Sequence, residues 1–201
     1  MISIAVLCSG NGTNLQAIID NVKSGYIPAE IALVVSDNDG AHALTRAKKA
    51  NIEILVLNPE EFESRDDYDK AIIKELKNKN IGLVALAGFM RILSPALVRA
   101  YENKIMNIHP ALLPAFRGTH GIKDAFEHGV KQTGVTVHFV DEKLDNGPII
   151  MQEALIVNEE DTLDSLEKKI HELEHRLYPE AIRLFVEGKL RIDGRKVRIK
   201  K

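Results

Sequence analysis

The sequence predicts a single α/β domain with a mostly parallel, twisted sheet and helices on both faces. Short apolar runs bounded by turn residues recur at residues 2–7, 31–35, 52–57 and 83–87. The segments between these runs have the 3.6-residue periodicity of helices. Regular alternation of strands and helices is typical of a parallel sheet covered on both faces. We therefore expect a Rossmann-like architecture.

Start signals define the predicted helices. Ser64 precedes an amphipathic helix over residues 66–76, and Ser94-Pro95 is a strong start signal for a short helix over residues 96–101. A long helix is expected to begin at Thr162. Serine and threonine favour these positions because their side chains accept a hydrogen bond from a free N–H of the first helical turn.

The pattern changes after the middle of the chain. A fifth strand is expected at residues 104–108, followed by strands near residues 135–140 and 148–155. A terminal hairpin is expected over residues 190–199, because Asp193-Gly194 is a strong hairpin-turn signal between two short alternating runs.

The chain of 201 residues, 45% of them hydrophobic, can bury the core of one domain, residues 1–201. No internal repeat, low-complexity tract or linker marks a boundary. Within this domain we expect a phosphate-binding half over about residues 1–100 and a catalytic half over about residues 101–187. The terminal hairpin at residues 189–199 follows.

Charge and cysteine usage exclude several classes of protein. Lys and Arg number 27 against 29 Asp and Glu, which gives a net charge of −2. The chain therefore lacks the excess of positive charge that is typical of proteins that bind nucleic acid or anionic membranes. No segment has the length of a membrane span or the basic start of a signal peptide. The single cysteine, Cys8, cannot form an intramolecular disulfide, and a buried inert thiol is expected. These features predict a cytoplasmic protein.

A glycine loop follows the first predicted strand. Ser9-Gly10-Asn11-Gly12-Thr13-Asn14 opens a helix, where backbone N–H groups can hold a phosphate. The loop lacks the third glycine of a dinucleotide fingerprint and the Gly-Lys-Ser/Thr of a P-loop, which leaves a small phosphate as the better candidate. The alternative is a tight turn in which Thr13 or Asn14 caps the helix.

Three polar groups could perform acyl transfer. Asn107-Ile108-His109-Pro110 and Asp145-Asn146-Gly147-Pro148 supply a carboxamide, an imidazole and a carboxylate. The amide can stabilise an oxyanion, the imidazole can exchange a proton, and the carboxylate can orient the imidazole. Asn107 and His109 share one face if the strand reaches them. The alternative makes Asn107 and Asp145 turn residues and His109 a satisfied core histidine.

Two prolines, Pro110 and Pro114, stiffen the loop that follows. Residues 111–118 contain too few polar side chains for an ordinary solvated connection. We expect this loop to form a wall of a pocket.

His171-Glu172-Leu173-Glu174-His175 matches the His-Glu-x-x-His pattern of zinc hydrolases and falls on a predicted helix. The apolar stripe of that helix leaves Glu172, the required general base, pointing outward. Glu174 lies within the stripe, where a carboxylate needs a partner. We therefore expect a polar helix flank and no metal site.

Four segments together resemble one family. They are Ser9-Gly10-Asn11-Gly12-Thr13-Asn14-Leu15-Gln16, Ala87-Gly88-Phe89-Met90-Arg91-Ile92-Leu93-Ser94-Pro95, Asn107-Ile108-His109-Pro110-Ala111-Leu112-Leu113-Pro114, and Gly134-Val135-Thr136-Val137-His138-Phe139-Val140 with Asp145-Asn146-Gly147-Pro148. The chain from residue 1 to about residue 185 resembles the folate-dependent phosphoribosylglycinamide formyltransferases of the formyltransferase superfamily. The Asn-His-Asp set is shared across that superfamily, and the glycine loop narrows the substrate.

The resemblance implies transfer of a formyl group from 10-formyltetrahydrofolate, without a metal, to the amine of 5-phosphoribosylglycinamide in purine biosynthesis. It implies catalysis by Asn107, His109 and Asp145. The substrate would be held at its phosphate by Gly12, Thr13 and Asn14 and at its ribose by Glu174. The implied folate-binding residues are Arg65, Met90, Arg91, Ile92, Leu93, Asn107, Val140, Asp141 and Asp145. Both partners would be small molecules, and the protein a monomer or homodimer.

Two segments of the chain depart from the usual sequence pattern of the family. A proline is expected near Phe116-Arg117, and a more polar, glutamine-bearing helix start is expected at residues 121–126; His120 is retained. Formyltetrahydrofolate hydrolases and the aminosugar and methionyl-tRNA formyltransferases use the same triad, although the chain's length argues against their additional domains. A non-catalytic phosphate- or folate-binding module is a further alternative, since it would need the sheet and the glycine loop but not the triad.

Overall fold

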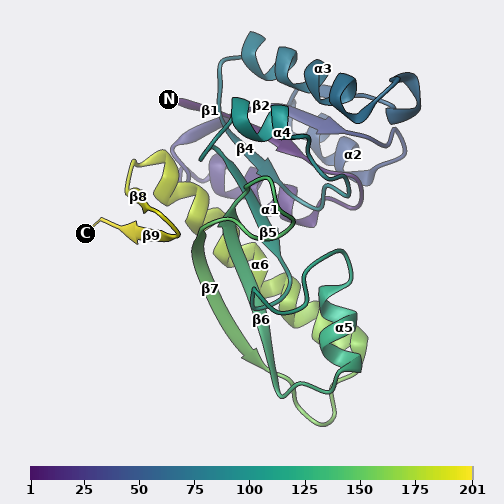
Figure 1. Ribbon diagram of the computed structural model, residues 1–201, viewed down its shortest axis with the longest axis vertical. Helices are drawn as coiled ribbons and strands as arrows, with labels where there is room; N and C mark the ends of the chain where they lie inside the picture. The colour runs from purple at the N-terminus through teal and green to yellow at the C-terminus, as the bar shows by residue number, and fades with distance from the viewer. Residues whose placement is uncertain (201) are drawn as a thin grey trace.

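The computed structural model describes residues 1–200, in which nine strands form one sheet of order β3-β2-β1-β4-β5-β6-β7-β9-β8. The strands are β1 (Ile2–Leu7), β2 (Ala29–Ser36), β3 (Ile54–Val56), β4 (Ile81–Leu86), β5 (Ile105–His109), β6 (Gln132–Phe139), β7 (Ile149–Ile156), β8 (Leu190–Asp193) and β9 (Lys196–Ile199). Strands β1 to β5 run parallel, and β6 is antiparallel to both β5 and β7 (Figure 1). The predicted mostly parallel α/β fold is confirmed.

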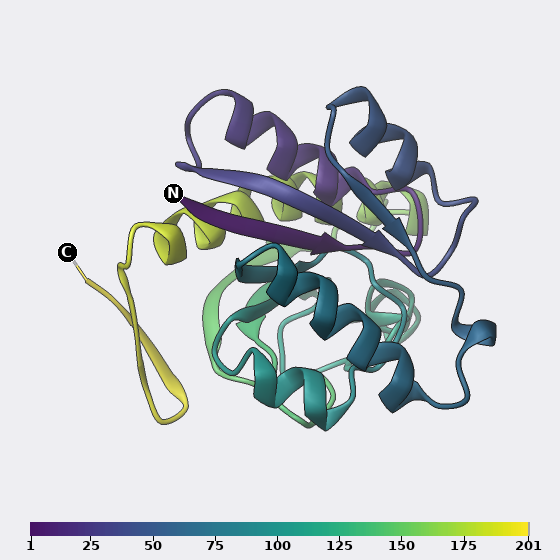
Figure 2. The ribbon, with the colours of Figure 1, turned by 90° about the horizontal axis from the view of Figure 1, so that it is seen from above.

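Helices cover both faces of the parallel half of the sheet. The helices of the structure are α1 (Thr13–Lys23), α2 (His42–Lys49), η1 (Pro59–Glu61, a 3₁₀ turn), α3 (Arg65–Asn78), α4 (Pro95–Ala100), α5 (Gly121–Glu127) and α6 (Leu163–Val186), and of these α5 packs against α6. Figure 2 shows α1 and α2 on one face and α3 and α4 on the other. Within residues 1–200, none of these helices has the length and apolar character needed to cross a membrane.

Strand β1 shows why its sequence is continuously apolar. Ile4 and Val6 pack into the core formed with α1, α2 and α6, whereas Ala5 and Leu7 pack into the core formed with α3 and α4. Successive side chains of a strand point to opposite faces, so a strand covered on both faces must be apolar at every position. Cys8 follows directly in the first core, where burial raises the pKa of its thiol to about 12.

The predicted helix starts agree with the structure. Ser64, Ser94 and Thr162 each precede a helix, and each side chain accepts a hydrogen bond from the backbone N–H three residues later. Proline 95 occupies the first position of α4, so this helix runs one residue earlier than predicted, from Pro95 to Ala100.

Strand β5 begins and ends one residue later than predicted and therefore includes His109. Its antiparallel pairing with β6 extends this far, because Asn107 lies opposite His138 and His109 opposite Thr136. The last residue of β4 and the second residue of β5 also contact α6. The buried hydroxyl of Tyr178 lies 2.9 Å from the carbonyl oxygens of both Leu86 and Met106.

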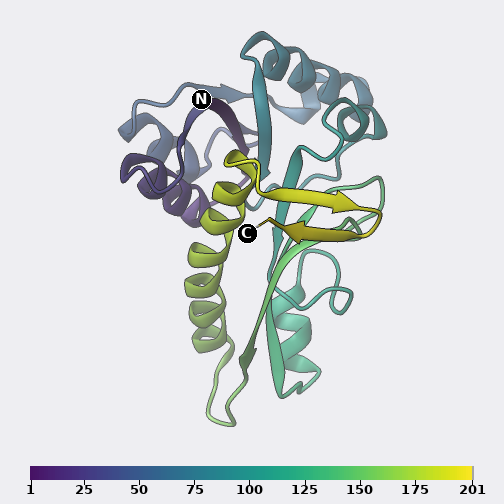
Figure 3. The same cartoon turned by 90° about the vertical axis from the view of Figure 1, so that its left-hand side faces the viewer.

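The terminal hairpin is confirmed as β8 and β9, which follow α6 and meet the start of β7, where Lys196 pairs with Ile149 (Figure 3). Its turn residues are Gly194-Arg195, one position later than the predicted Asp193-Gly194, since Asp193 pairs with Lys196. Gly194 has a φ of 58°, as the first central position of a type II′ turn requires.

The N-terminus of α6 provides a prediction about acid stability. Asp161 accepts hydrogen bonds from Lys169, Ser165 and the backbone N–H of Asn158, which lower the pKa of its carboxyl group to about 2. In the unfolded chain this pKa is about 3.9. The ionised group therefore stabilises the fold above about pH 4, and this contribution is lost as the pH falls towards about 2.

We expect Asp161→Asn to lower the urea midpoint near neutral pH, and we expect the difference from the unaltered protein to shrink as the pH falls from about 4. Urea unfolding at a series of pH values measures this difference. Glu159→Gln, at an exposed neighbouring position, serves as the control. A difference that stays constant down to about pH 2 would contradict the assignment.

Candidate active site

A cavity of about 720 Å³ lies at the carboxyl ends of β1, β4 and β5, where open α/β sheets bind ligands. It is lined by nearly all of the residues proposed for the site, namely Gly12, Thr13, Asn14, Met90, Arg91, Ile92, Leu93, Asn107, His109, Val140, Asp141, Asp145 and Glu174. Arg65 is the exception. It is the exposed first residue of α3 and does not belong to the cavity lining.

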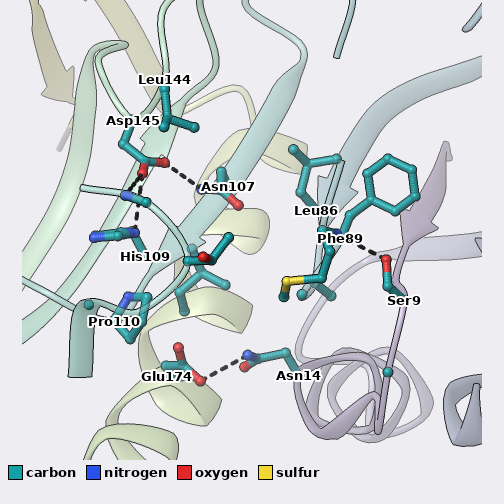
Figure 4. Close-up of a pocket in the computed structure, with 18 of the residues that line it drawn as sticks. Ser9, Asn14, Leu86, Phe89, Asn107, His109, Pro110, Leu144, Asp145 and Glu174 are labelled. Carbon is teal, nitrogen blue, oxygen red and sulfur yellow. Dashed lines mark hydrogen bonds and ion pairs between the residues drawn. The ribbon is translucent and has the colours of Figure 1, made fainter. Parts of the chain in front are cut away.

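The carboxylate of Asp145 joins the other two predicted catalytic groups. One of its oxygens lies 3.4 Å from Asn107 Nδ2, and the other lies 3.6 Å from His109 Nδ1. The second oxygen also accepts a 2.8 Å hydrogen bond from the backbone N–H of Gly118. Figure 4 shows Asp145 beside both Asn107 and His109. The three groups predicted from separate segments therefore converge.

The surroundings of His109 determine which ring nitrogen can exchange a proton. Its Nε2 lies 2.7 Å from the carbonyl oxygen of Phe116, which can only accept, so the hydrogen stays on Nε2. Nδ1 is then free to take up or release a proton, and it faces Asp145. The side chain of His109 is only 3% exposed, although it belongs to the lining of the cavity.

His138 is a further residue of the cavity lining, and the sequence pattern alone predicts no role for it. Its Nδ1 lies 2.7 Å from the carbonyl oxygen of Phe139, so Nδ1 carries the hydrogen and Nε2 accepts from Asn107 Nδ2 at 3.2 Å. Burial lowers the pKa of His138 and favours this neutral form. His138 thus directs the NH₂ group of Asn107 towards itself and Asp145. Only the β5–β6 register, which places residues 107 and 138 opposite each other, reveals this role.

The glycine loop is held by α2. Arg46 Nε donates to the Asn11 carbonyl oxygen at 2.8 Å, and Arg46 Nη2 donates to Asn11 Oδ1 at 3.1 Å. Gly12 is the N-cap of α1 with a φ of 73°, and a Cβ at this position would lie 2.6 Å from Ala43 Cβ. Only glycine fits this turn. The first N–H groups of α1 lie at the cavity, which suits a small phosphate.

The alternative in which Thr13 or Asn14 caps α1 is wrong. Gly12 occupies the N-cap without any side-chain cap, and Asn14 turns instead towards α6, where its Nδ2 donates to Glu174 Oε2 at 3.0 Å. Glu174 is buried, with 4% of the residue exposed, as its place in the apolar stripe predicts. Its carboxylate can accept hydrogen bonds from the hydroxyl groups of a ligand.

His171 is the second partner of Glu174. Its Nδ1 lies 2.9 Å from Glu174 Oε2, and this hydrogen bond raises the pKa of His171. The rings of His171 and His175 stack with centroids 6.4 Å apart. Among residues 1–200, no cluster of three or more His, Cys, Asp or Glu side chains is placed to hold a metal ion. The signal for the His171 contact was its spacing of three residues from Glu174 on one helix.

The opposite side of the cavity carries exposed apolar side chains. Met90, Ile92 and Leu144 are 61%, 58% and 52% exposed at its rim. Large apolar groups gathered around a cavity are typical of a surface that binds a planar organic ligand. The backbone N–H of Met90 donates to Ser9 Oγ at 2.9 Å, which links this segment to the glycine loop.

The loop over residues 111–118 forms less of the cavity wall than predicted. Only its last residue, Gly118, belongs to the lining, although Pro110 before it does as well. The loop instead packs against β6, where Thr136 Oγ1 donates to the Ala111 carbonyl oxygen at 2.7 Å and accepts from the Leu113 N–H at 3.0 Å. Its apolar residues are explained by this packing rather than by a ligand.

Comparison with known proteins agrees with this geometry. A sequence model described as formyl transferase matches residues 2–182. The chain is 44% identical to the phosphoribosylglycinamide formyltransferase of Bacillus subtilis, over 91% of this chain and 94% of that protein. It is also 44% identical to the trifunctional purine biosynthetic protein adenosine-3 of Chironomus tentans, over 96% of this chain but only 14% of that protein.

A solved structure gives the same result. The crystal structure of glycinamide ribonucleotide transformylase 1 from Symbiobacterium toebii superposes with a TM-score of 0.98 at 49% identity, covering 100% of this chain and 95% of that chain. The chain belongs to the formyl transferase family and, within it, groups with the phosphoribosylglycinamide formyltransferases.

Proposed function

We propose that this protein transfers the formyl group of 10-formyltetrahydrofolate to the amine of 5-phosphoribosylglycinamide, with Asn107, His109 and Asp145 as its catalytic residues. The products are formylglycinamide ribonucleotide and tetrahydrofolate, and no metal takes part. The observation that carries the proposal is the convergence of these three side chains in a cavity that also holds the glycine loop.

The chemistry follows from the atoms that face one another. The neutral amine attacks the formyl carbon, a C–N bond forms, and the carbonyl oxygen becomes an oxyanion. The N–H contact from Asn107 to Asp145 is 3.4 Å long, at the outer limit of a hydrogen bond, so this hydrogen can turn to the oxyanion. Protonated His109 adds positive charge at Nδ1.

Proton transfer completes the reaction. The attacking nitrogen loses a proton to Asp145, directly or through water, and the bond between the formyl carbon and N10 of the folate then breaks. The electron pair stays on N10, which takes the proton that Asp145 received, directly or through water, so that Asp145 ends as a carboxylate again. The long contact between Asp145 and His109, 3.6 Å, is expected to shorten when substrate binds.

The two ends of the cavity suit the two substrates. Gly12, Thr13 and Asn14 would hold the phosphate, and Glu174 would accept hydrogen bonds from the ribose. The heterocycle of the folate would be held by the apolar rim and the backbone of residues 90–93. Val140 and Asp141 would contact it as well. Because Arg65 is exposed outside the lining, we propose it as a contact only for a folate tail that extends beyond the cavity.

We propose that the protein works in the cytoplasm as a monomer or homodimer acting on small molecules. The free, buried Cys8 suits a reducing compartment. The chain has 27 basic and 29 acidic residues, so it has no excess of positive charge that would favour binding to a nucleic acid.

The deciding experiment measures formyl transfer from 10-formyltetrahydrofolate with and without 5-phosphoribosylglycinamide in metal-free buffer. We expect formylated product and loss of the donor only when the acceptor is present. Donor breakdown without the acceptor would indicate a hydrolase, and binding of both ligands without turnover would indicate a binding module. Either result would overturn the proposal.

The role of Glu174 leads to a prediction of its own. Glu174→Gln should raise the KM for 5-phosphoribosylglycinamide about 10- to 100-fold, because hydrogen bonds to a charged acceptor contribute about 1.5–3 kcal/mol. The KM for the folate donor should stay unchanged. Steady-state kinetics with each substrate varied tests this, with exposed Glu172→Gln on the same helix as the control. Equal KM values for both variants would exclude Glu174 from the substrate site.

A further inference from the structure

The segment that carries Asp145 is fixed tightly on one side. Asp145 has a φ of 46°, a conformation that few residues adopt. Within the same segment, Asp141 accepts hydrogen bonds from Asn146 Nδ2 at 2.7 Å and from the Lys143 N–H at 2.9 Å. A Cβ at Gly147 would overlap the carbonyl oxygen of Phe139, so the chain passes close to β6 there. These contacts fix the backbone of residues 141–147 on the side that faces β6.

The tip of the terminal hairpin contacts the same segment from outside. Arg195, the second residue of the β8–β9 turn, donates from Nη2 to the carbonyl oxygen of Asn146 at 2.7 Å. Asn146 is the neighbour of Asp145. The hairpin is held in place by the pairing of Lys196 in β9 with Ile149 in β7, three residues beyond Asn146. Figure 3 shows the hairpin close to the start of β7.

The turn itself makes this contact possible. The positive φ of Gly194 and the two-residue turn place Arg195 at the tip, and partly buried Leu190, Ile192 and Val197 pack the hairpin against the main core. The family match ends at residue 182, so the hairpin lies outside the matched region.

We propose that Arg195 is a positioning residue for the reaction, which holds the Asn146 carbonyl and thereby the backbone at Asp145 in the geometry that presents the carboxylate to His109 and Asn107. This inference rests on the proposed function. The Asn146 carbonyl belongs to the Asn146–Gly147 peptide, which shares the Cα atom of Asn146 with the Asp145–Asn146 peptide, so a shift of this carbonyl can be passed to the backbone at Asp145. A carboxylate that already lies 3.6 Å from His109 Nδ1 is sensitive to such a shift, because catalytic groups must be held within about 0.5 Å of their productive positions.

The test compares Arg195→Ala and Arg195→Lys with Arg191→Ala, an exposed arginine on the other strand of the same hairpin. We expect Arg195→Ala to lower kcat three- to tenfold while the KM for 5-phosphoribosylglycinamide and the thermal midpoint stay unchanged. Arg195→Lys should recover part of kcat, because an ammonium group can also donate to one carbonyl oxygen. Arg191→Ala should match the unaltered protein.

Two results would overturn the inference. One is a kcat for Arg195→Ala equal to that of Arg191→Ala. The other is a loss of kcat in Arg195→Ala that comes with a lowered thermal midpoint, where Arg195→Lys restores neither quantity. That result would indicate a purely structural role. The unaltered protein separates this inference from the proposed function, since absence of formyl transfer in that sample would contradict the function itself.

Discussion

His109→Asn is expected to lower kcat about 10²–10³-fold, which is the usual effect of removing one group that stabilises an oxyanion. Asparagine is uncharged, so it cannot supply the positive charge or the proton that we assign to Nδ1 of His109. In the unaltered protein the Phe116 carbonyl oxygen fixes the hydrogen on Nε2, so the role falls to Nδ1 of His109, and asparagine has no equivalent nitrogen. Rapid-quench or steady-state measurement of formyl transfer at saturating concentrations of both substrates gives kcat directly.

The partners of His109 should behave as one unit with it. Asp145→Asn and Asn107→Ala are each expected to lower kcat by a similar factor, and His109→Asn combined with Asp145→Asn should be little worse than either alone. The reason is that Asp145 lies 3.6 Å from His109 Nδ1 and acts together with it. Thermal midpoints should show that these variants fold. His128→Asn, at an exposed position after α5, is the control. Near-normal turnover in the catalytic variants would remove these residues from the mechanism.

Gly134→Ala should destabilise the fold by about 3 kcal/mol, at the upper end of the usual cost of overpacking. A Cβ at Gly134 in β6 would overlap the Glu153 carbonyl oxygen of β7, and it would lie 2.8 Å from Leu112 Cδ2 and 3.0 Å from Ala154 Cα. Two of these three atoms belong to the backbone of a paired strand, so relief requires β6 and β7 to separate. Urea unfolding measures the change in free energy.

Gly82→Ala in β4 is the matched control for this variant. The Cβ added at Gly82 would lie 3.0 Å from the side-chain atom Ile2 Cγ2 and 3.8 Å, an ordinary contact distance, from the Ser3 carbonyl oxygen, so its one tight contact is with a side chain and not with backbone. Its effect should stay below about 1 kcal/mol, because alanine also restricts the unfolded chain. Equal stability of the two variants would contradict the backbone clash at Gly134.

Local features of this fold could be predicted because the interactions that produce them span only a few residues. Ser64, Ser94 and Thr162 begin helices through hydrogen bonds to amides three residues away. The alternation of apolar residues in β1 follows from the two-residue repeat of a strand. The common face of Asn107 and His109 follows from the same repeat, provided that β5 extends to His109, as it does.

The assembled site depended on contacts between residues far apart in the chain. Asn14 binds Glu174 rather than capping its own helix, because the packing of α1 against α6 brings a buried carboxylate within 3.0 Å. The pairing register of β5 with β6 places His138 opposite Asn107. The packing of residues 111–118 on β6 explains the apolar loop that the sequence predicts as a cavity wall.

The sequence by itself determined the succession of strands and helices along the chain, the position of the glycine loop, and the side chains that we propose for formyl transfer. Only the tertiary structure decided that Asp145 meets Asn107 and His109, that Arg65 lies outside the cavity, and that the hairpin tip reaches Asn146. The physical reason is that short-range hydrogen bonds and side-chain periodicity act within a few residues, whereas these contacts require the strand register and the packing of the whole sheet.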